Sequence, residues 1–144
     1  MKKLYFLFTL MFAFSIQSQV IITEIADPNN DSQARFIELT NIGDSAFDLT
    51  GYQLVRWTNA NTAYTTSSAV DLSEFGSLQS KGILTLANNT KFETVYGVAP
   101  TKVIGSGGPA DSNGDDNLAI LDPNGSIYDV YGCLLYTADA ADDA

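Results

Sequence analysis

The side chains with the clearest capacity for chemistry lie in an acidic, glycine-rich stretch from Gly107 to Asn117. Oxygen donors alternate along this stretch, as they do in a calcium loop, where a bending backbone directs several hard oxygens at one cation. The candidate calcium ligands are Asp111, Asn113, Asp115, Asn117 and Asp122. Two features weaken the match, because Asp116 stands where such a loop needs glycine and Asp122 is shorter than the usual Glu. The competing interpretation is a solvated turn in which Asp, Asn and Gly serve the backbone geometry.

A second acidic pair, Glu24 and Glu38, belongs to two neighbouring predicted strands. Paired carboxylates perform acid–base chemistry or bind metal. The sequence does not fix the strand register, and opposed like charges destabilise a sheet unless something bridges them. No other acid, base or nucleophile is apparent around the pair. We therefore expect a structural role, either in hydrogen bonds at a sheet edge or in pairing with Arg35 or Arg56.

The chain of 144 residues has no histidine and a single cysteine, Cys133. The lack of His excludes Ser-His-Asp triads, Cys-His dyads, His-ligated zinc and the usual neutral-pH general base. One cysteine cannot form an internal disulfide, so the fold must rest on its hydrophobic core. We expect no catalytic residue in this chain and no cofactor other than calcium.

Four aromatic residues, Tyr52, Trp57, Tyr64 and Tyr96, offer a surface on which a glycan could stack. The stronger expectation is that Trp57 packs into a sandwich core and the tyrosines lie at its rim. Gly105 to Gly108 is not followed by the Lys or the helix start of a phosphate-binding loop. We interpret that stretch as an ordinary loop.

Short runs of β-forming residues, separated by turn formers, must position these side chains. Asn124-Gly125 is a strong hairpin signal, and 91–97 is either one helical turn or a loop crossing. The residues after 19 contain no window of 11 or more with a helical period. The pattern predicts one all-β domain, an immunoglobulin-like Greek-key β-sandwich. The expected strands are 20–25, 35–41, 52–57, 70–72, 83–87, 101–104, 117–121 and 126–131.

The first nineteen residues have the order of a secretory signal peptide. A basic start at residues 1–3 precedes the apolar run Leu4 to Ile16, and Gln17-Ser18-Gln19 is polar. We expect residues 1–19 to be the signal peptide, with cleavage near Ser18 or Gln19. The apolar run of 13 residues is shorter than the roughly 20 that a spanning helix needs, and an uncleaved anchor is the alternative. The prediction is a secreted or cell-surface protein with no membrane span in its mature form.

The chain is acidic, with seventeen Asp and Glu residues against seven Lys and Arg and a net charge of −10. The segment 20–132 alone carries fourteen acidic and five basic residues, a net charge of −9. Such a surface repels nucleic acid, which needs a positive partner. The expected partners are an extracellular protein or glycan, or a domain that follows in a longer chain.

Five ordered strand segments within 20–132 resemble the lamin tail domain family. Members of this family are small immunoglobulin-like sandwiches, and in bacteria they occur in secreted or surface proteins beside nucleases, phosphatases or adhesive modules. The resemblance implies a noncatalytic accessory or attachment role. Nothing in the chain resembles the coiled-coil rod of nuclear lamins, so filament, nuclear and DNA-binding functions are not implied. The segments are VIITEI from Val20, FIELTN from Phe36, DLTGYQL from Asp48, KGILTL from Lys81, and NLAILD from Asn117 with the following Gly125 to Tyr131.

The last twelve residues, Cys133 to Ala144, differ in character from the domain. They resemble the translation of a sequencing adapter and depart from it at Ala138, where the adapter gives Ser. We expect 133–144 to be a non-native tail, which would make the natural protein continue past Gly132. A short final strand with an acidic tail is the alternative.

Three functions follow from these patterns. The first is a secreted, noncatalytic lamin-tail-like module for extracellular attachment or for spacing a partner domain. The second is the N-terminal accessory domain of a truncated exported hydrolase, such as a nuclease or phosphatase. The third is a calcium-dependent adhesive module.

Overall fold

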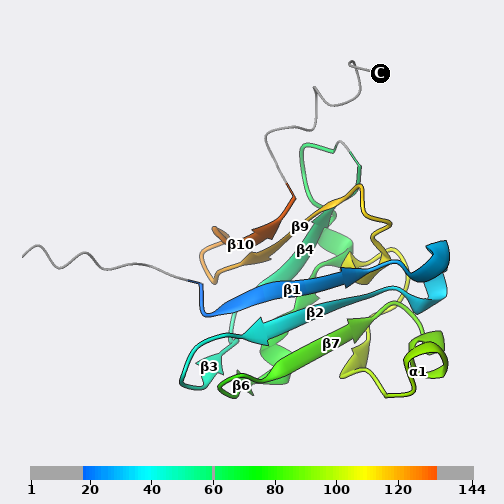
Figure 1. Ribbon diagram of the computed structural model, residues 1–144. Coiled ribbons are helices and arrows are strands. Elements are labelled where there is room, and N and C mark those ends of the chain that lie inside the picture. Colours follow the sequence, from blue (N-terminus) through cyan, green and yellow to red (C-terminus); the bar gives the residue numbers. More distant parts are fainter. Residues whose placement is uncertain (1–17, 60, 133–144) are drawn as a thin grey trace, which may run out of the picture.

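Two four-stranded sheets face each other in the computed structural model, which describes residues 18–59 and 61–132 (Figure 1). The first sheet has the order β1-β2-β7-β8, formed by Val20–Ala26, Phe36–Asn41, Ile83–Ala87 and Lys102–Val103. The second has the order β10-β9-β4-β5, formed by Ile127–Tyr131, Asn117–Leu121, Gln53–Trp57 and Val70–Asp71. A short ribbon pairs β3, Phe47–Asp48, with β6, Ser77–Leu78.

The chain changes sheet three times, between β2 and β4, between β5 and β7, and between β8 and β9. All strand pairs are antiparallel except β7 with β8. This arrangement confirms the predicted all-β, immunoglobulin-like Greek-key sandwich. The expected strands 83–87 and 117–121 match β7 and β9, and the other expected strands are present within one or two residues. The two-residue strands β3 and β6 were not predicted, because two residues carry no alternation to detect.

Only short helices accompany the strands in the described part of the chain. The one α-helix, α1, spans Lys91–Tyr96 and ends at Gly97, whose φ of 73° is left-handed and whose N–H donates to the carbonyl of Glu93. The sequence left this segment open between a helical turn and a loop, and the helical turn is what forms. The 3₁₀ turns are η1 Pro28–Asn30, η2 Ser32–Ala34, η3 Thr66–Ser68, η4 Leu72–Phe75 and η5 Pro109–Asp111.

The main core lies between the sheets and follows the alternation of the strands. Ile37 and Leu39 of β2 point inward toward Leu54 of β4 and Ile120 of β9, and all four are fully buried. Burial of each such side chain contributes about 1.5–3 kcal/mol relative to its exposure. Since the chain holds no internal disulfide among these residues, this apolar contact is the principal source of its stability.

A second apolar layer covers the outer face of the sheet β10-β9-β4-β5. Val55 and Ala119 are fully buried there, against Trp57, Tyr64 and Ala69 of the same face and its covering loop. The rings of Trp57 and Tyr64 meet edge to face at 5.4 Å between centroids. The expectation that Trp57 packs between the sheets was therefore wrong, because the segment 58–69 supplies a cover for the outer face. Tyr52 does lie at the rim of the main core, edge to face with Phe47.

Two segments of similar sequence close one end of the sandwich. In Asp48-Leu49-Thr50 and Asp71-Leu72-Ser73 the aspartate carboxylate accepts the backbone N–H two residues later, at 3.0 and 2.9 Å. The side-chain and backbone hydrogen bonds of Thr50 and Ser73 lower the pKa values of these aspartates. Each turn drives its leucine into the core, where Leu49 and Leu72 are fully buried. The N–H of Gly51 donates to the Ser73 hydroxyl at 2.8 Å, which joins the two turns.

No helix in the ranges 18–59 and 61–132 is long and apolar enough to cross a membrane. The predicted signal peptide lies outside the described residues up to Gln17, and so does the predicted non-native tail from Cys133.

Candidate functional site

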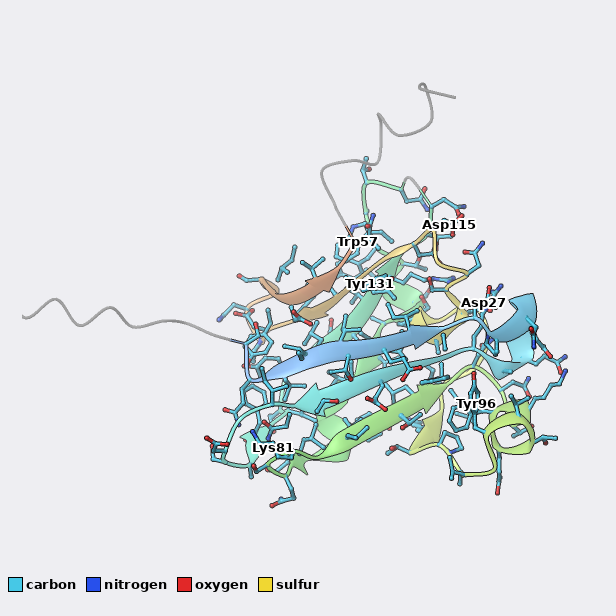
Figure 2. All side chains as sticks on the ribbon, in the orientation of Figure 1. Asp27, Trp57, Lys81, Tyr96, Asp115 and Tyr131 are labelled. Carbon is cyan, nitrogen blue, oxygen red and sulfur yellow. The ribbon has the colours of Figure 1, made fainter. Side chains whose placement is uncertain are left out.

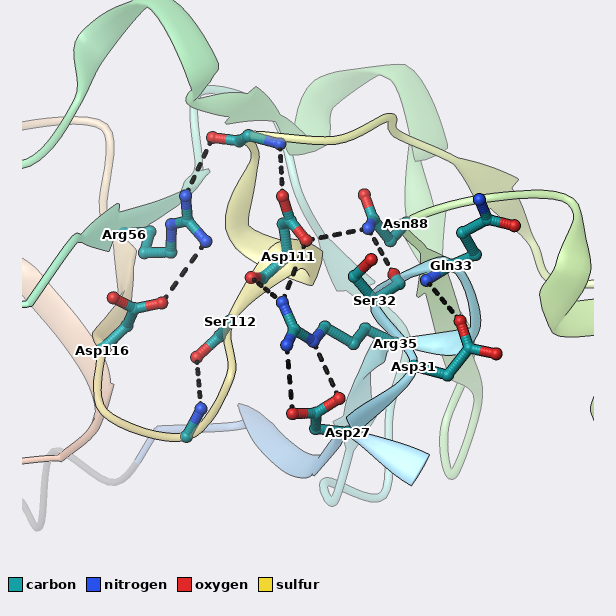
Figure 3. Close-up of polar contacts among 12 residues, drawn as sticks. Asp27, Asp31, Ser32, Gln33, Arg35, Arg56, Asn88, Asp111, Ser112 and Asp116 are labelled. Carbon is teal, nitrogen blue, oxygen red and sulfur yellow. Dashed lines mark hydrogen bonds and ion pairs between the residues drawn. The ribbon is translucent and has the colours of Figure 1, made fainter. Parts of the chain in front are cut away.

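The polar residues at one end of the sandwich converge on the loop that links β8 to β9 (Figure 3). Arg35 precedes β2, Asn88 follows β7, and Asp111 ends η5 in the loop itself. The loop folds back because Gly107 adopts a left-handed φ of 78° and Pro109 begins η5 with its fixed φ. Pro109 and Ala110 are buried, so the turn is anchored to the core and holds Asp111 in place.

Arg35 is the centre of this cluster. Its Nε and Nη2 donate to the two carboxylate oxygens of Asp27, at 2.8 and 3.1 Å, in a bidentate pair. Its Nη1 donates to Oδ1 of Asp111 at 3.2 Å and to the Asp111 carbonyl at 3.0 Å. The hydrogen bond to Asp27, with the nearby negative charge, raises the pKa of the guanidinium against the effect of its burial. The cation therefore joins three segments of the chain.

Asp111 accepts two further hydrogen bonds. Asn88 Nδ2 donates to Oδ1 at 2.9 Å, and the backbone N–H of Gly107 donates to Oδ2 at 2.9 Å. Asn88 Nδ2 also donates to the carbonyl of Ser32 at 2.5 Å, which ties the end of β7 to η2. Both oxygens of the Asp111 carboxylate are thus held by protein donors.

A second ion pair lies beside the first. Arg56 of β4 donates from Nη1 to Oδ2 of Asp116 at 3.3 Å and from Nη2 to the carbonyl of Gly107 at 3.2 Å. Asp116 Oδ1 accepts the backbone N–H of Asn59 at 2.8 Å, and the Asp116 side chain is only 2% exposed. Gly107 therefore bridges the pairs, since its N–H binds Asp111 and its carbonyl binds Arg56. We refer to Asp27, Arg35, Arg56, Asp111, Asp116 and Gly107 as the arginine–aspartate cluster.

The structure does not gather the five predicted calcium ligands at one point. Asp111 is bound to Arg35, whereas Asn113 and Asp115 are exposed farther along the loop. Asn117 lies within β9 opposite Trp57. Figure 2 shows Asp115 at the same end of the sandwich as Asp27, with Lys81 at the other end.

Asp122 follows the C-terminal end of β9, whereas the other four candidate ligands lie at or before its N-terminal end. Its carboxylate accepts the N–H groups of Asn124 at 2.8 Å and Ser126 at 2.9 Å, which lower its pKa and shape the β9–β10 hairpin. At about 3.4 Å per residue, β9 separates Asn117 from Asp122 by roughly 17 Å. Across the described residues, no three Asp, Glu, His or Cys side chains are grouped as a metal site. Calcium binding stays a prediction, and it cannot use these five residues as one loop.

Glu24 and Glu38 are direct neighbours in the register of β1 and β2. A β-bulge between Ile22 and Glu24 precedes this pairing. Glu38 Oε1 accepts hydrogen bonds from the hydroxyls of Thr23 at 2.8 Å and Thr40 at 3.4 Å. The hydrogen-bonded role expected for Glu38 is the one it has, whereas the arginines considered as its partners form their ion pairs with aspartates.

The sequence did not indicate that these arginines and aspartates would meet in one cluster. Arg35 and Arg56 were considered only as partners of glutamates, and Asp27 and Asn88 were not singled out. One signal was available, since 20–132 has only five basic residues and two of them are arginines. Arginine is the side chain suited to bidentate carboxylate pairing in partly buried places.

The sandwich order and the strand segments agree with one comparison to known proteins. The family model described as Lamin Tail Domain matches residues 15–134. The chain belongs to the lamin tail domain family. A search of curated proteins found no match. The arginine–aspartate cluster therefore closes the loop end of a lamin tail domain, and the resemblance drawn from the five strand segments is confirmed.

Proposed function

We propose that this lamin tail domain is an exported, noncatalytic module that attaches to an extracellular partner or spaces a neighbouring domain. The observation that carries the proposal is the arginine–aspartate cluster. Its carboxylates and guanidinium groups bind one another and the backbone, so they fix the loops at one end of the sandwich. A rigid sandwich that displays loops is the usual basis of a binding module.

The two ends of the described chain join the sandwich through neighbouring strands. The chain enters at the start of β1 and leaves after β10 (Figure 1), and Ser18 and Gln19 bond to Tyr128 of β10. Segments before and after the sandwich would therefore join it through two strands that are fastened to each other. The domain's charge of −9 favours a neutral or basic extracellular protein or a glycan as partner, and it disfavours nucleic acid.

Fractionation of cells that express the full chain tests the proposal. We expect the wild-type protein outside the cytoplasm, with a portion retained on washed cells. A Leu7→Arg/Leu10→Arg variant, which interrupts the apolar run, should remain in the cytoplasm, and Leu7→Val/Leu10→Val, which keeps the same two positions apolar, is the matched control. A wild-type protein that stays in the cytoplasm contradicts the proposal.

The accessory-domain alternative has its own test. A genomic read through the locus shows whether the reading frame continues past Gly132 and which domain follows. A hydrolase domain downstream would assign this module to the accessory role. A frame that continues into a surface-anchoring segment would support attachment.

A further inference from the structure

The residues at the predicted signal-peptide boundary are part of the folded sandwich. Ser18 Oγ donates to the carbonyl of Tyr128, and the backbone N–H of Gln19 donates to the Tyr128 hydroxyl at 2.7 Å. The N–H of Ile22 donates to Asp129 Oδ2 at 2.7 Å. These bonds fasten β1, the first strand of one sheet, to β10, the last strand of the other.

The side chain of Gln19 fits closely against Gly43 and Ser45. Its Nε2 donates to the carbonyl of Ser45 at 2.8 Å, and the backbone carbonyl of the same residue accepts the N–H of Ile42 at 2.8 Å. Gly43 lies directly against this side chain, because a Cβ at position 43 would be 2.4 Å from Gln19 Cγ. Such a contact is far inside van der Waals distance, so Gln19 in this position requires a residue without a side chain at 43.

The next residue is unsuited to be a chain terminus. Val20 is 1% exposed and pairs with Asn41 in the register of β1 and β2. A cut between Gln19 and Val20 would place a charged α-ammonium group at this buried residue. It would also remove the acceptor of the Ile42 N–H and the two donors of Gln19. Burial of an unpaired charge is strongly unfavourable.

We propose that signal-peptide processing cuts before Gln19 and leaves this residue on the mature domain. There Gln19 holds the N-terminus against Tyr128, Ile42 and Ser45, and we call it the N-terminal latch. The inference rests on the proposed export. It moves the domain boundary from Val20 to Gln19 or earlier. The bonds after Ser18 and after Ser15 both follow a small residue, and Ala13-Phe14-Ser15 has small residues at both positions that signal peptidase reads.

Mass spectrometry of the exported full-length product tests the cut. We expect a mature N-terminus at Gln19 or at a residue before it. An exported protein that begins at Val20 or later overturns this inference while the proposed export stands. A chain found in the cytoplasm with Met1 retained contradicts both.

Variants of the latch give a second, independent readout. Gln19→Ala should lower the urea midpoint of the exported protein by roughly 0.5 M, since the side-chain hydrogen bond to the Ser45 carbonyl and the packing against Gly43 are lost, whereas the backbone bonds to Tyr128 and Ile42 remain. Gly43→Ala should lower it similarly by expelling Gln19, and the double variant should lose no more than the larger single loss. Gln33→Ala, at an exposed residue that uses its backbone N–H, is the matched control. An unchanged midpoint for Gln19→Ala, or fully additive losses in the double variant, would show that the contacts of Gln19 with Gly43 and Ser45 do not hold the N-terminus in place.

Discussion

Replacement of Asp111 by Ala separates a structural role for the acidic loop from a calcium site. The substitution removes three acceptor contacts, from Arg35 Nη1 at 3.2 Å, Asn88 Nδ2 at 2.9 Å and the Gly107 N–H at 2.9 Å. Each of these three donors still has another acceptor after the substitution. Arg35 keeps its bidentate pair with Asp27 and its bond to the Asp111 carbonyl, and Asn88 keeps the Ser32 carbonyl. Gly107 is exposed, so its N–H can turn to water.

The expected loss is smaller than for a fully broken buried ion pair, which costs roughly 3–5 kcal/mol. A hydrogen bond to a charged group contributes about 1.5–3 kcal/mol, and the side chains of Arg35 and Asp111 are 11% and 22% exposed. With the retained contacts, we expect Asp111→Ala to lower the free energy of unfolding by about 2–3 kcal/mol. Asp115→Ala, at an exposed position of the same loop, should change it by less than about 0.5 kcal/mol.

The assay is urea unfolding of wild type and both variants, in EDTA and in millimolar calcium. An internal ion pair predicts the same loss from Asp111→Ala in both conditions, because Arg35 is present in either. A calcium site predicts that calcium stabilises the wild type and that both variants lose this gain. The reasoning is refuted if Asp111→Ala loses under about 0.5 kcal/mol in EDTA, or if Asp115→Ala loses as much as Asp111→Ala.

Three further outcomes can be measured on the same protein. The pKa values of Asp48 and Asp122 lie below their usual value of 3.8 in the folded state because backbone and hydroxyl groups donate to the charged carboxylates. Their stabilisation is therefore complete above about pH 4 and is lost as the pH falls through the lowered values, and urea midpoints across pH 2 to 7 should show that decline. Leu72→Ala empties a fully buried site at the end of the core and should cost about 2–5 kcal/mol by calorimetry or urea unfolding. Glu24→Gln removes the like charge opposite Glu38 and should stabilise the protein by about 0.2–1 kcal/mol at low salt, less at high salt, and a destabilised variant would indicate that a cation bridges the pair.

The fold followed from the sequence where residue patterns are local. Alternation in Ile83–Ala87 and the turn formers around Asn117–Leu121 place β7 and β9 correctly, because both signals act over a few residues. The position of Trp57 did not follow from its strand. Whether a strand face is inside or outside depends on what covers it, and here the segment 58–69 makes the outer face a second apolar layer.

The site illustrates the same limit for charged groups. The spacing of Asp111, Asn113 and Asp115 correctly marks a loop rich in oxygen donors. Spacing alone cannot show whether a metal ion or a positively charged side chain pairs with these oxygens. Arg35 is 76 residues away from Asp111 in the chain and reaches it only through the pairing of the sheets. A positive charge supplied by the protein itself was therefore invisible to a search for ligand spacing.

The hydrogen bonds that fasten the start of β1 to β10 have a consequence for the timing of folding. They join residues 107 to 110 positions apart, namely Ser18 and Gln19 with Tyr128, and Ile22 with Asp129. Contacts of such long range form only after nearly the whole domain has been synthesised, and they slow folding because a long loop must close first. A chain that emerges N-terminus first can therefore not complete its sandwich until its final strand arrives. Under the proposed export, that delay would keep the chain unfolded, and so able to cross the membrane, until the crossing is nearly finished.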